Sequence, residues 1–158
     1  MQGRWEETEA KPIVNNTPYG QKTEREQLVF DLNTADTTDL QQLPGIGHTF
    51  SNRIVSYRNL LGGFVDKHQL LEVYNLTEEQ YSRIEPYVVV GNAQVRQINL
   101  NEATLDQLKK HPYLSYYQAK AIVQYRNISQ FDSVPDLLKV SLIDQQTYNK
   151  VKPYLTVR

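Results

Sequence analysis

From Phe30 onward, apolar residues recur at helical spacing. The clearest stripe has intervals of four, three and four residues, and it consists of Phe50, Ile54, Tyr57 and Leu61. Such positions share one face of a helix. Gly62 and Gly63 are expected to end this helix, because glycine readily takes the left-handed conformation of a helix C-terminus. No segment alternates in the manner of a strand, so the pattern predicts an all-α fold.

The second half of the chain repeats the first. FDLNTADTTDLQQLPGIG aligns with INLNEATLDQLKKHPYLS, and RIVSYRN aligns with AIVQYRN, each 68 residues later. The offset then becomes 67, because LLGGF in the first copy faces the shorter ISQF in the second. A tandem duplication of one helical unit explains both offsets.

The repeat defines the predicted domains. Two modules span residues 30–90 and 98–158, and the polar segment GNAQVRQ at 91–97 links them. Residues 1–29 mix charged residues with proline and glycine and show no sustained helical period. They are therefore expected to form a flexible tail.

Capping pairs predict where the helices begin. A polar side chain followed three residues later by a second one can satisfy two free backbone amides reciprocally. The pairs are Asp36 with Asp39, Asp66 with Gln69, Thr77 with Gln80, Thr104 with Gln107, Ser115 with Gln118, Ser133 with Asp136, and Asp144 with Thr147. Gly47 stands in the first copy where Ser115 stands in the second. Each module is thus predicted to hold about four short helices, the last ended by Pro86 or Pro153.

Composition excludes some chemistry but indicates no partner. The chain has no cysteine, which excludes disulfides, Cys-ligated zinc and a thiol nucleophile. Lys and Arg number 17 against 18 Asp and Glu, but residues 30–90 carry a net charge of −4 and residues 91–158 a net charge of +4. No apolar run approaches the roughly 18 residues of a membrane span, and residues 1–29 lack the apolar core of a signal peptide.

The segment LPGIG, residues 43–47, lies between the first two predicted helices. Gly45 permits a positive φ, Ile46 can point inward to hold the helices together, and Gly47 leaves room for another backbone. The turn would present free amides at the start of the next helix, where they and the helix dipole favour a phosphate. Such contacts read no bases. The alternative interpretation is a turn that is purely structural.

At this segment the chain resembles the helix-hairpin-helix family. NTADTTDLQQLPGIG, followed by RIVSYR and GGF, is similar to the competence protein ComEA group, including duplicated proteins of Bacteroidetes-type bacteria, over residues 30–157. The resemblance implies two SAM-domain-like, ComEA-like modules and weak DNA binding without sequence preference. It further implies a link to DNA uptake in a bacterium, at the cell envelope if an anchor precedes the chain and otherwise in the cytoplasm.

The resemblance also implies the site. Its residues would be Gly45, Ile46, Gly47, His48, Thr49 and Arg53, the last three assisting from the first turns of the helix. Phe50 stands where the family often has a lysine. Some family hairpins hold a monovalent cation, and the resemblance allows one here; we expect no other cofactor and no metal site.

The second copy departs from this motif. HPYLS replaces LPGIG, so Tyr113 and Ser115 take the places of the two glycines. Lys109, Lys110 and Lys120 surround this degenerate hairpin and could supply a second, purely electrostatic contact with DNA. The alternative is a solvated basic face. The later turns VYNLT and VSLID also lack a glycine pair.

The tyrosines support a different function. Six of the 11 occupy matched positions on apolar stripes, which is typical of core packing. Tyr113, Tyr116 and Tyr117 are exceptions and are predicted to form an exposed aromatic patch. The alternative function is therefore a protein-interaction scaffold that has lost DNA binding. The recurring Arg58 and Arg126, at the end of the second helix, are more typical of residues that cap carbonyls or pair with a carboxylate than of DNA contacts.

A catalytic role finds no support in the motif residues. DNA glycosylases that carry this hairpin have a lysine just after it and an aspartate about twenty residues further on. Asp66 lies near that distance, but His48 and Thr49 occupy the lysine positions. The three histidines have neither metal-ligand spacing nor the arrangement of a triad. The sequence therefore predicts that the protein is not an enzyme and has no small-molecule substrate.

Overall fold

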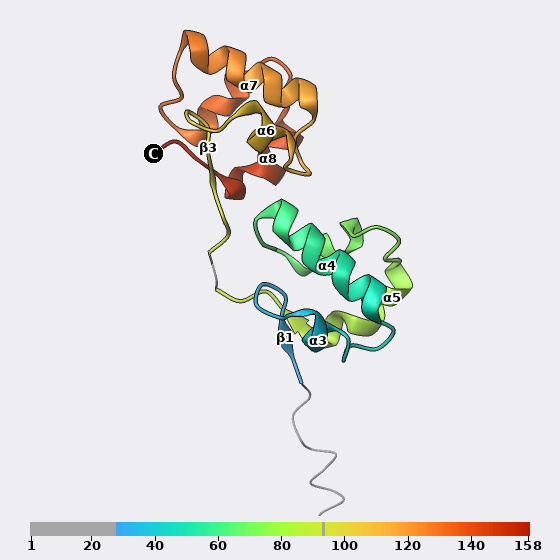
Figure 1. The fold of residues 1–158 in the computed structure, drawn as a ribbon. Coiled ribbons are helices and arrows are strands. Elements are labelled where there is room, and N and C mark those ends of the chain that lie inside the picture. The colour runs from blue at the N-terminus through green and yellow to red at the C-terminus, as the bar shows by residue number, and fades with distance from the viewer. Residues whose placement is uncertain (1–27, 93) are drawn as a thin grey trace, which may run out of the picture.

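The computed structural model describes residues 28–92 and 94–158, and it confirms an all-α tandem repeat. Two helical modules lie one above the other, and an extended segment connects them (Figure 1). The predicted tail at residues 1–29 lies outside the described residues, except for its last two.

The two modules contain the same elements in the same order. The first consists of β1 (Phe30–Asp31), α3 (Thr37–Leu40), α4 (His48–Leu61), η1 (Lys67–Glu72), α5 (Glu78–Ile84), η2 (Glu85–Tyr87) and β2 (Val88–Val89). The second consists of β3 (Ile98–Asn99), α6 (Leu105–Lys109), α7 (Tyr116–Ile128), η3 (Val134–Lys139), α8 (Gln145–Val151), η4 (Lys152–Tyr154) and β4 (Leu155–Thr156). The elements labelled η are 3₁₀-helices, so the third helix of each module is tighter than an α-helix.

The expectation that the chain has no strands is wrong in one detail. β1 pairs in parallel with β2, and β3 pairs in parallel with β4, with Phe30 opposite Val88 and Ile98 opposite Leu155. Each strand has two residues, too few for an alternating pattern to appear in the sequence. The pairs join the beginning of each module to its end.

The predicted capping pairs define most helix starts. Reciprocal capping boxes open α3, η1, α5, α6, α7 and η3. At α8 the Asp144 side chain accepts a hydrogen bond from the Thr147 amide. At α4 the N-cap is Gly47, which offers no side-chain acceptor. Local sequence therefore sets where the helices begin, and α4 begins differently from the rest.

Each module closes around its own apolar core, and a recurring arginine ties each core to the loop before it. The Arg58 guanidinium donates to the carbonyls of Leu32 and Ala35 at 2.9 and 2.7 Å. Arg126 donates to the carbonyl of Leu100 at 2.8 Å. Of the two expected roles, these bonds favour binding to backbone carbonyls over pairing with a carboxylate, and the carbonyls belong to the preceding loop and not to the helix end.

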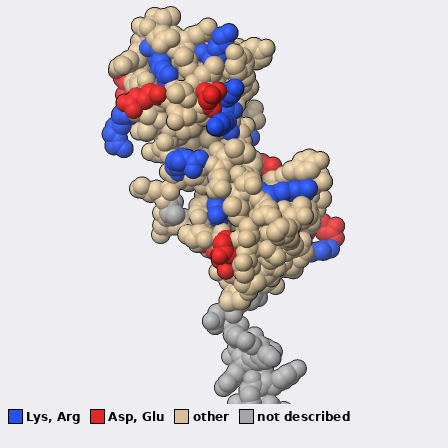
Figure 2. Space-filling view, viewed as in Figure 1, with Lys and Arg blue, Asp and Glu red and all other residues tan. Residues whose placement is uncertain are grey.

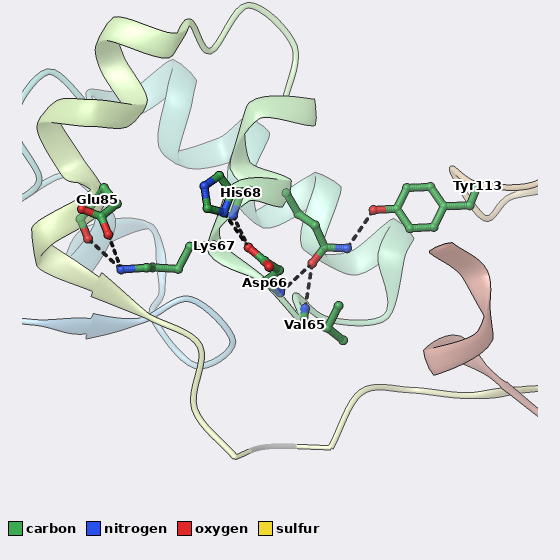
Figure 3. A network of polar contacts seen from close by, with 7 residues as sticks. Val65, Asp66, Lys67, His68, Glu85 and Tyr113 are labelled. Atoms are coloured by element: carbon green, nitrogen blue, oxygen red, sulfur yellow. Dashed lines mark hydrogen bonds and ion pairs between the residues drawn. The ribbon is translucent and has the colours of Figure 1, made fainter. Parts of the chain in front are cut away.

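Tyr154 joins the two modules. The residue belongs to the second module, but its fully buried ring packs in the core of the first. Its hydroxyl donates to the carbonyl of Gly63 at 2.7 Å and accepts from the amide group of Gln69 at 2.9 Å. The Gln69 carbonyl oxygen in turn accepts from the amides of Val65 and Asp66, at 2.7 and 3.1 Å (Figure 3). The modules therefore share a buried, hydrogen-bonded contact.

We expect Tyr154→Phe to lower the free energy of unfolding by about 1–3 kcal/mol, because it leaves the Gly63 carbonyl and the Gln69 amide without their buried partner. Tyr87→Phe is the matched control, since Tyr87 holds the same repeat position in the first module and is only partly buried. Urea denaturation monitored by circular dichroism measures both variants. Equal stability losses in the two variants would contradict this role of the Tyr154 hydroxyl.

Candidate nucleic-acid interface

Four turns of the same form precede α4, α5, α7 and α8. In each, a backbone amide donates at 3.1 Å to the carbonyl three residues earlier: Ile46 to Leu43, Leu76 to Val73, Leu114 to His111, and Ile143 to Val140. Gly45 (φ 79°) and Asn75 (φ 64°) adopt the left-handed conformation at the same place in the two turns of the first module. The closing hydrogen bond therefore recurs at all four sites, whereas the left-handed residue occurs in the two turns of the first module and not at Tyr113 or Leu142.

The first hairpin presents its backbone to solvent. Gly45, Gly47, His48 and Thr49 are exposed, whereas Ile46 is buried. A side chain at Gly47 would meet no atom within 4 Å. Among the α-helices of residues 28–92 and 94–158, α4 alone begins without a side-chain cap. Its first amides thus belong to exposed residues and have no side-chain acceptor from their own turn.

The other three hairpins carry their own acceptor at the helix start. Thr77 accepts from the Gln80 amide at 3.2 Å, and Ser115 accepts from the Gln118 amide at 3.1 Å. Asp144 accepts from the Thr147 amide at 2.8 Å. Hydrogen bonds from Thr147 lower the pKa of Asp144, so this carboxylate is charged at neutral pH and repels an anion. Each cap occupies a position that a phosphate would need.

Two arginines flank the first hairpin. Arg53 of α4 was predicted from the sequence, and its guanidinium lies 5.3 Å from the ring centroid of Phe50. Arg83 of α5 was not predicted. Its Nη1 atom lies 3.9 Å from the position that a Cβ on Gly45 would occupy, and its Nη2 atom lies 2.9 Å from Glu79. In the sequence Arg83 and Glu79 resemble an ordinary surface ion pair. Only the packing of α5 beside the turn reveals that Arg83 lies close to Gly45.

The cations of the acidic first module divide into two kinds. Residues 30–90 contain four basic side chains. Arg58 is held by backbone carbonyls, and the Lys67 amine lies 2.6 Å from the Glu85 carboxylate (Figure 3). The other two, Arg53 and Arg83, lie at the hairpin. Arg83 is paired with Glu79 as Lys67 is with Glu85, so the positive charge near the open amides comes mainly from Arg53.

The three lysines predicted for the second module are exposed but lie on different elements. Lys109 ends α6 and lies 3.3 Å from Asp106, while Lys120 lies on α7. Lys110 lines a cavity of about 560 Å³ at the junction of the modules, together with Arg96. On the face seen in Figure 2, basic residues are interspersed with acidic ones. The basic contribution of this module is distributed over its surface.

The predicted exposed patch of three tyrosines is wrong for Tyr113. Its hydroxyl accepts from the Gln69 amide group at 2.8 Å (Figure 3). It also donates to the Glu72 carboxylate at 2.8 Å. Burial raises the pKa of Tyr113, which keeps this hydroxyl protonated as a donor. Tyr116 and Tyr117 are exposed as expected, with ring centroids 5.3 Å apart. The degenerate hairpin docks onto the first module, and this contact buries part of the residue at its tip.

His111 completes this docking contact. The side chain is buried, its Nδ1 atom accepts from the Tyr113 amide at 3.1 Å, and its Nε2 atom lies 2.9 Å from the Leu61 carbonyl. Because Nδ1 is an acceptor, the ring is neutral and carries its hydrogen on Nε2. Burial is the main cause that lowers the pKa of His111, and Arg96 contributes in the same direction.

The residues at 28–92 and 94–158 contain no group of three His, Cys, Asp or Glu side chains arranged to hold a metal. Within the same ranges, no helix combines the length and apolarity needed to cross a bilayer.

The chain belongs to the helix-hairpin-helix motif family, whose pattern matches residues 25–89 and 93–156. The two matches cover both halves of the duplication, and their turns are those that present or cap the helix starts described above. Membership of this family supports DNA binding as the general function and DNA as the partner.

Curated relatives fall into two groups. "Endonuclease/exonuclease/phosphatase family domain-containing protein 1" is 27% identical in Danio rerio and 26% identical in Xenopus laevis, over 78% and 82% of this chain. The chain spans about a quarter of these relatives, 26% and 27% of their lengths. "ComE operon protein 1" of Bacillus subtilis is 34% identical over 39% of this chain and 30% of that protein, which supports the ComEA-like assignment.

The relatives contradict the prediction that the protein is not an enzyme. The proteins of Danio rerio and Xenopus laevis are named for an endonuclease/exonuclease/phosphatase family domain. The prediction rested on the side chains around the hairpin, where the glycosylase lysine is replaced by His48 and Thr49. Side chains at a hairpin indicate only whether the hairpin itself could be catalytic. They do not indicate the kind of protein in which the modules occur.

The geometry of His111 predicts that stability depends on pH. The folded-state pKa of His111 lies below the ordinary value of 6.5, so the stabilisation that the neutral ring contributes is fully present above pH 6.5. As the pH falls, the unfolded chain binds the proton first, and the free energy of unfolding decreases until the folded-state pKa is passed. His111→Asn should remove this part of the pH dependence, because Asn can still accept from the Tyr113 amide but does not titrate.

Urea denaturation between about pH 7 and pH 5 measures this effect, since histidine titrates in that range. His48→Gln is the matched control, because His48 is exposed and lies outside the junction. A pH dependence that persists unchanged in His111→Asn would contradict the assignment.

Proposed function

We propose that the chain binds DNA without sequence preference through the N-terminus of α4. The backbone amides of Gly47, His48 and Thr49 would contact a phosphate, while Gly45 and Ile46 hold the turn that presents them. The observation that carries this proposal is the exposed, uncapped start of α4. Free amides and the positive end of the helix dipole together favour a phosphate there.

Side chains near the turn would add electrostatic contacts. Arg53 and the polar groups of His48 and Thr49 would contact the flanking backbone of the same strand, a role supported by the exposure of His48 and Thr49 beside the turn. Lys109, Lys110 and Lys120 would provide a second contact, which relies on charge alone. Because the first module has a net charge of −4, we expect the affinity to be weak and to fall steeply with salt.

We further propose DNA uptake as the biological setting. This proposal is supported by the resemblance of the LPGIG hairpin to the ComEA group and by the similarity to the ComE operon protein of Bacillus subtilis. Non-specific phosphate contacts suit such a role, because incoming DNA has no fixed sequence.

A second candidate function is a protein-interaction scaffold. The exposed, adjacent rings of Tyr116 and Tyr117 favour it, because aromatic side chains are enriched where proteins meet. This function would not require the open amides of α4, so a DNA-binding measurement separates the two.

Fluorescence anisotropy of a labelled DNA of arbitrary sequence tests the proposal directly. We expect saturable binding at low salt, with the logarithm of the association constant falling by roughly 2–4 units per tenfold increase in salt, as for about two to four phosphate contacts. A second DNA of unrelated sequence should bind equally well. Absence of binding at low salt would contradict the proposal and favour the scaffold.

Gly47→Asp gives the sharpest test of the site. The new carboxylate would cap α4 as Asp144 caps α8, so the helix should be as stable as before or more stable. It would also occupy and repel the phosphate position, and we expect the affinity for DNA to fall at least about tenfold. Gly47→Ser, which caps without charge as Ser115 does, should lie between this variant and the wild type.

Asn127→Asp is the charge control for Gly47→Asp, since it adds one negative charge at an exposed position near the end of α7. Anisotropy at one salt concentration compares the affinities, and thermal denaturation compares the stabilities. Equal losses in Gly47→Asp and Asn127→Asp would move the contact away from α4 and onto the lysines of the second module.

A further inference from the structure

Tyr74 is an exposed aromatic residue beside the first hairpin. It lies at the tip of the second turn of the first module, and 72% of its surface is exposed. A tyrosine that contributed to the core would be buried, as Tyr81 of the following helix is. Core packing therefore does not account for a large aromatic side chain at this turn.

The position of this ring is held by Arg53. The guanidinium donates to the Tyr74 carbonyl at 3.3 Å and lies 5.0 Å from the centroid of the Tyr74 ring. The same guanidinium lies 5.3 Å from the ring of Phe50, the third residue of α4. The Tyr74 ring thus contacts Arg53, and Arg53 contacts Phe50 in the first turn of α4, where the uncapped amides lie. A cation lies on one side of the ring, and its high exposure leaves the other side to solvent.

A second guanidinium lies on the other flank of the turn. Arg83 lies next to Gly45 and is paired with Glu79, so Arg53 is the cation that accompanies the Tyr74 ring. An open aromatic ring beside a cation, near free backbone amides, matches the two chemical parts of a nucleotide. The amides and the cation suit the phosphate, and the ring suits the flat face of a base.

We infer that Tyr74 is a stacking platform for an unpaired base of the strand whose phosphate is bound at α4. The inference rests on the proposed function and adds the class of substrate: single-stranded DNA, or a duplex with a single-stranded overhang, in preference to a blunt duplex. In a closed duplex the faces of each internal base are covered by neighbouring bases, so the ring would gain no stacking contact there.

Tyr117 of the second module offers a matched comparison. It is 70% exposed, close to the value for Tyr74, and it also lies near a hairpin. Its ring packs against Tyr116, and the helix that carries it begins with the Ser115 cap. Tyr117→Ala therefore removes an equally exposed ring from a helix start that is already capped.

The test compares three labelled ligands in one low-salt buffer: a single strand of mixed sequence, its blunt duplex, and the duplex with a single-stranded overhang. We expect the wild type to bind the single strand and the overhang duplex more tightly than the blunt duplex. Tyr74→Ala should weaken binding to the single strand about tenfold and leave binding to the blunt duplex nearly unchanged. Tyr74→Phe should retain the preference, and Tyr117→Ala should bind as the wild type does.

A spectroscopic readout adds a check that does not depend on affinity. A single strand containing the fluorescent base 2-aminopurine should be quenched by the saturating wild type and by Tyr74→Phe, and much less by saturating Tyr74→Ala. Equal affinity of the wild type for single strand and blunt duplex, or unchanged binding and quenching in Tyr74→Ala, overturns the stacking platform while DNA binding itself stands. Absence of binding to all three ligands overturns the proposed function and this inference together.

Discussion

The first backbone amides of a helix need acceptors, and the way each hairpin meets this need determines what it can do. Thr77, Ser115 and Asp144 supply the acceptor from within their own turns. At α4 the corresponding residue is Gly47, which has no side chain, so the first amides of α4 need an acceptor from outside the turn. Four turns with the same closing hydrogen bond thus differ in the acceptor that they offer to the following helix. The absence of a side chain at residue 47 leaves α4 as the uncapped one of these four helix starts.

The corresponding hairpins of the two modules also differ in their contacts. In the second module, the hairpin that corresponds to the open one carries His111 and Tyr113, and these residues contact the first module through Leu61, Gln69 and Glu72. His111 and Tyr113, which make this turn depart from the motif, are therefore the residues that bind it to the first module. The hairpin of the second module thus carries a capped helix start and forms an interface within the chain.

Much of the fold could be predicted from local patterns, whereas part of the site could not. The repeat and the capping pairs are encoded within a few residues, so the helix starts at Asp36, Thr104 and Ser115 follow from the sequence. The positions of Arg83 and Tyr113 depend on which elements pack together, and no spacing in the sequence reports that. The two-residue strands escaped prediction because they are shorter than one period of the pattern.

The contact made by Tyr154 has a consequence for the order in which the chain can fold during synthesis. That ring packs among core residues of the first module, yet the residue belongs to η4, near the end of the second module. A ribosome delivers the chain from its N-terminus, so this contact between the modules can form only after residue 154 has emerged. The packing between the two halves, although they are similar enough to be aligned residue by residue, is therefore completed late in synthesis.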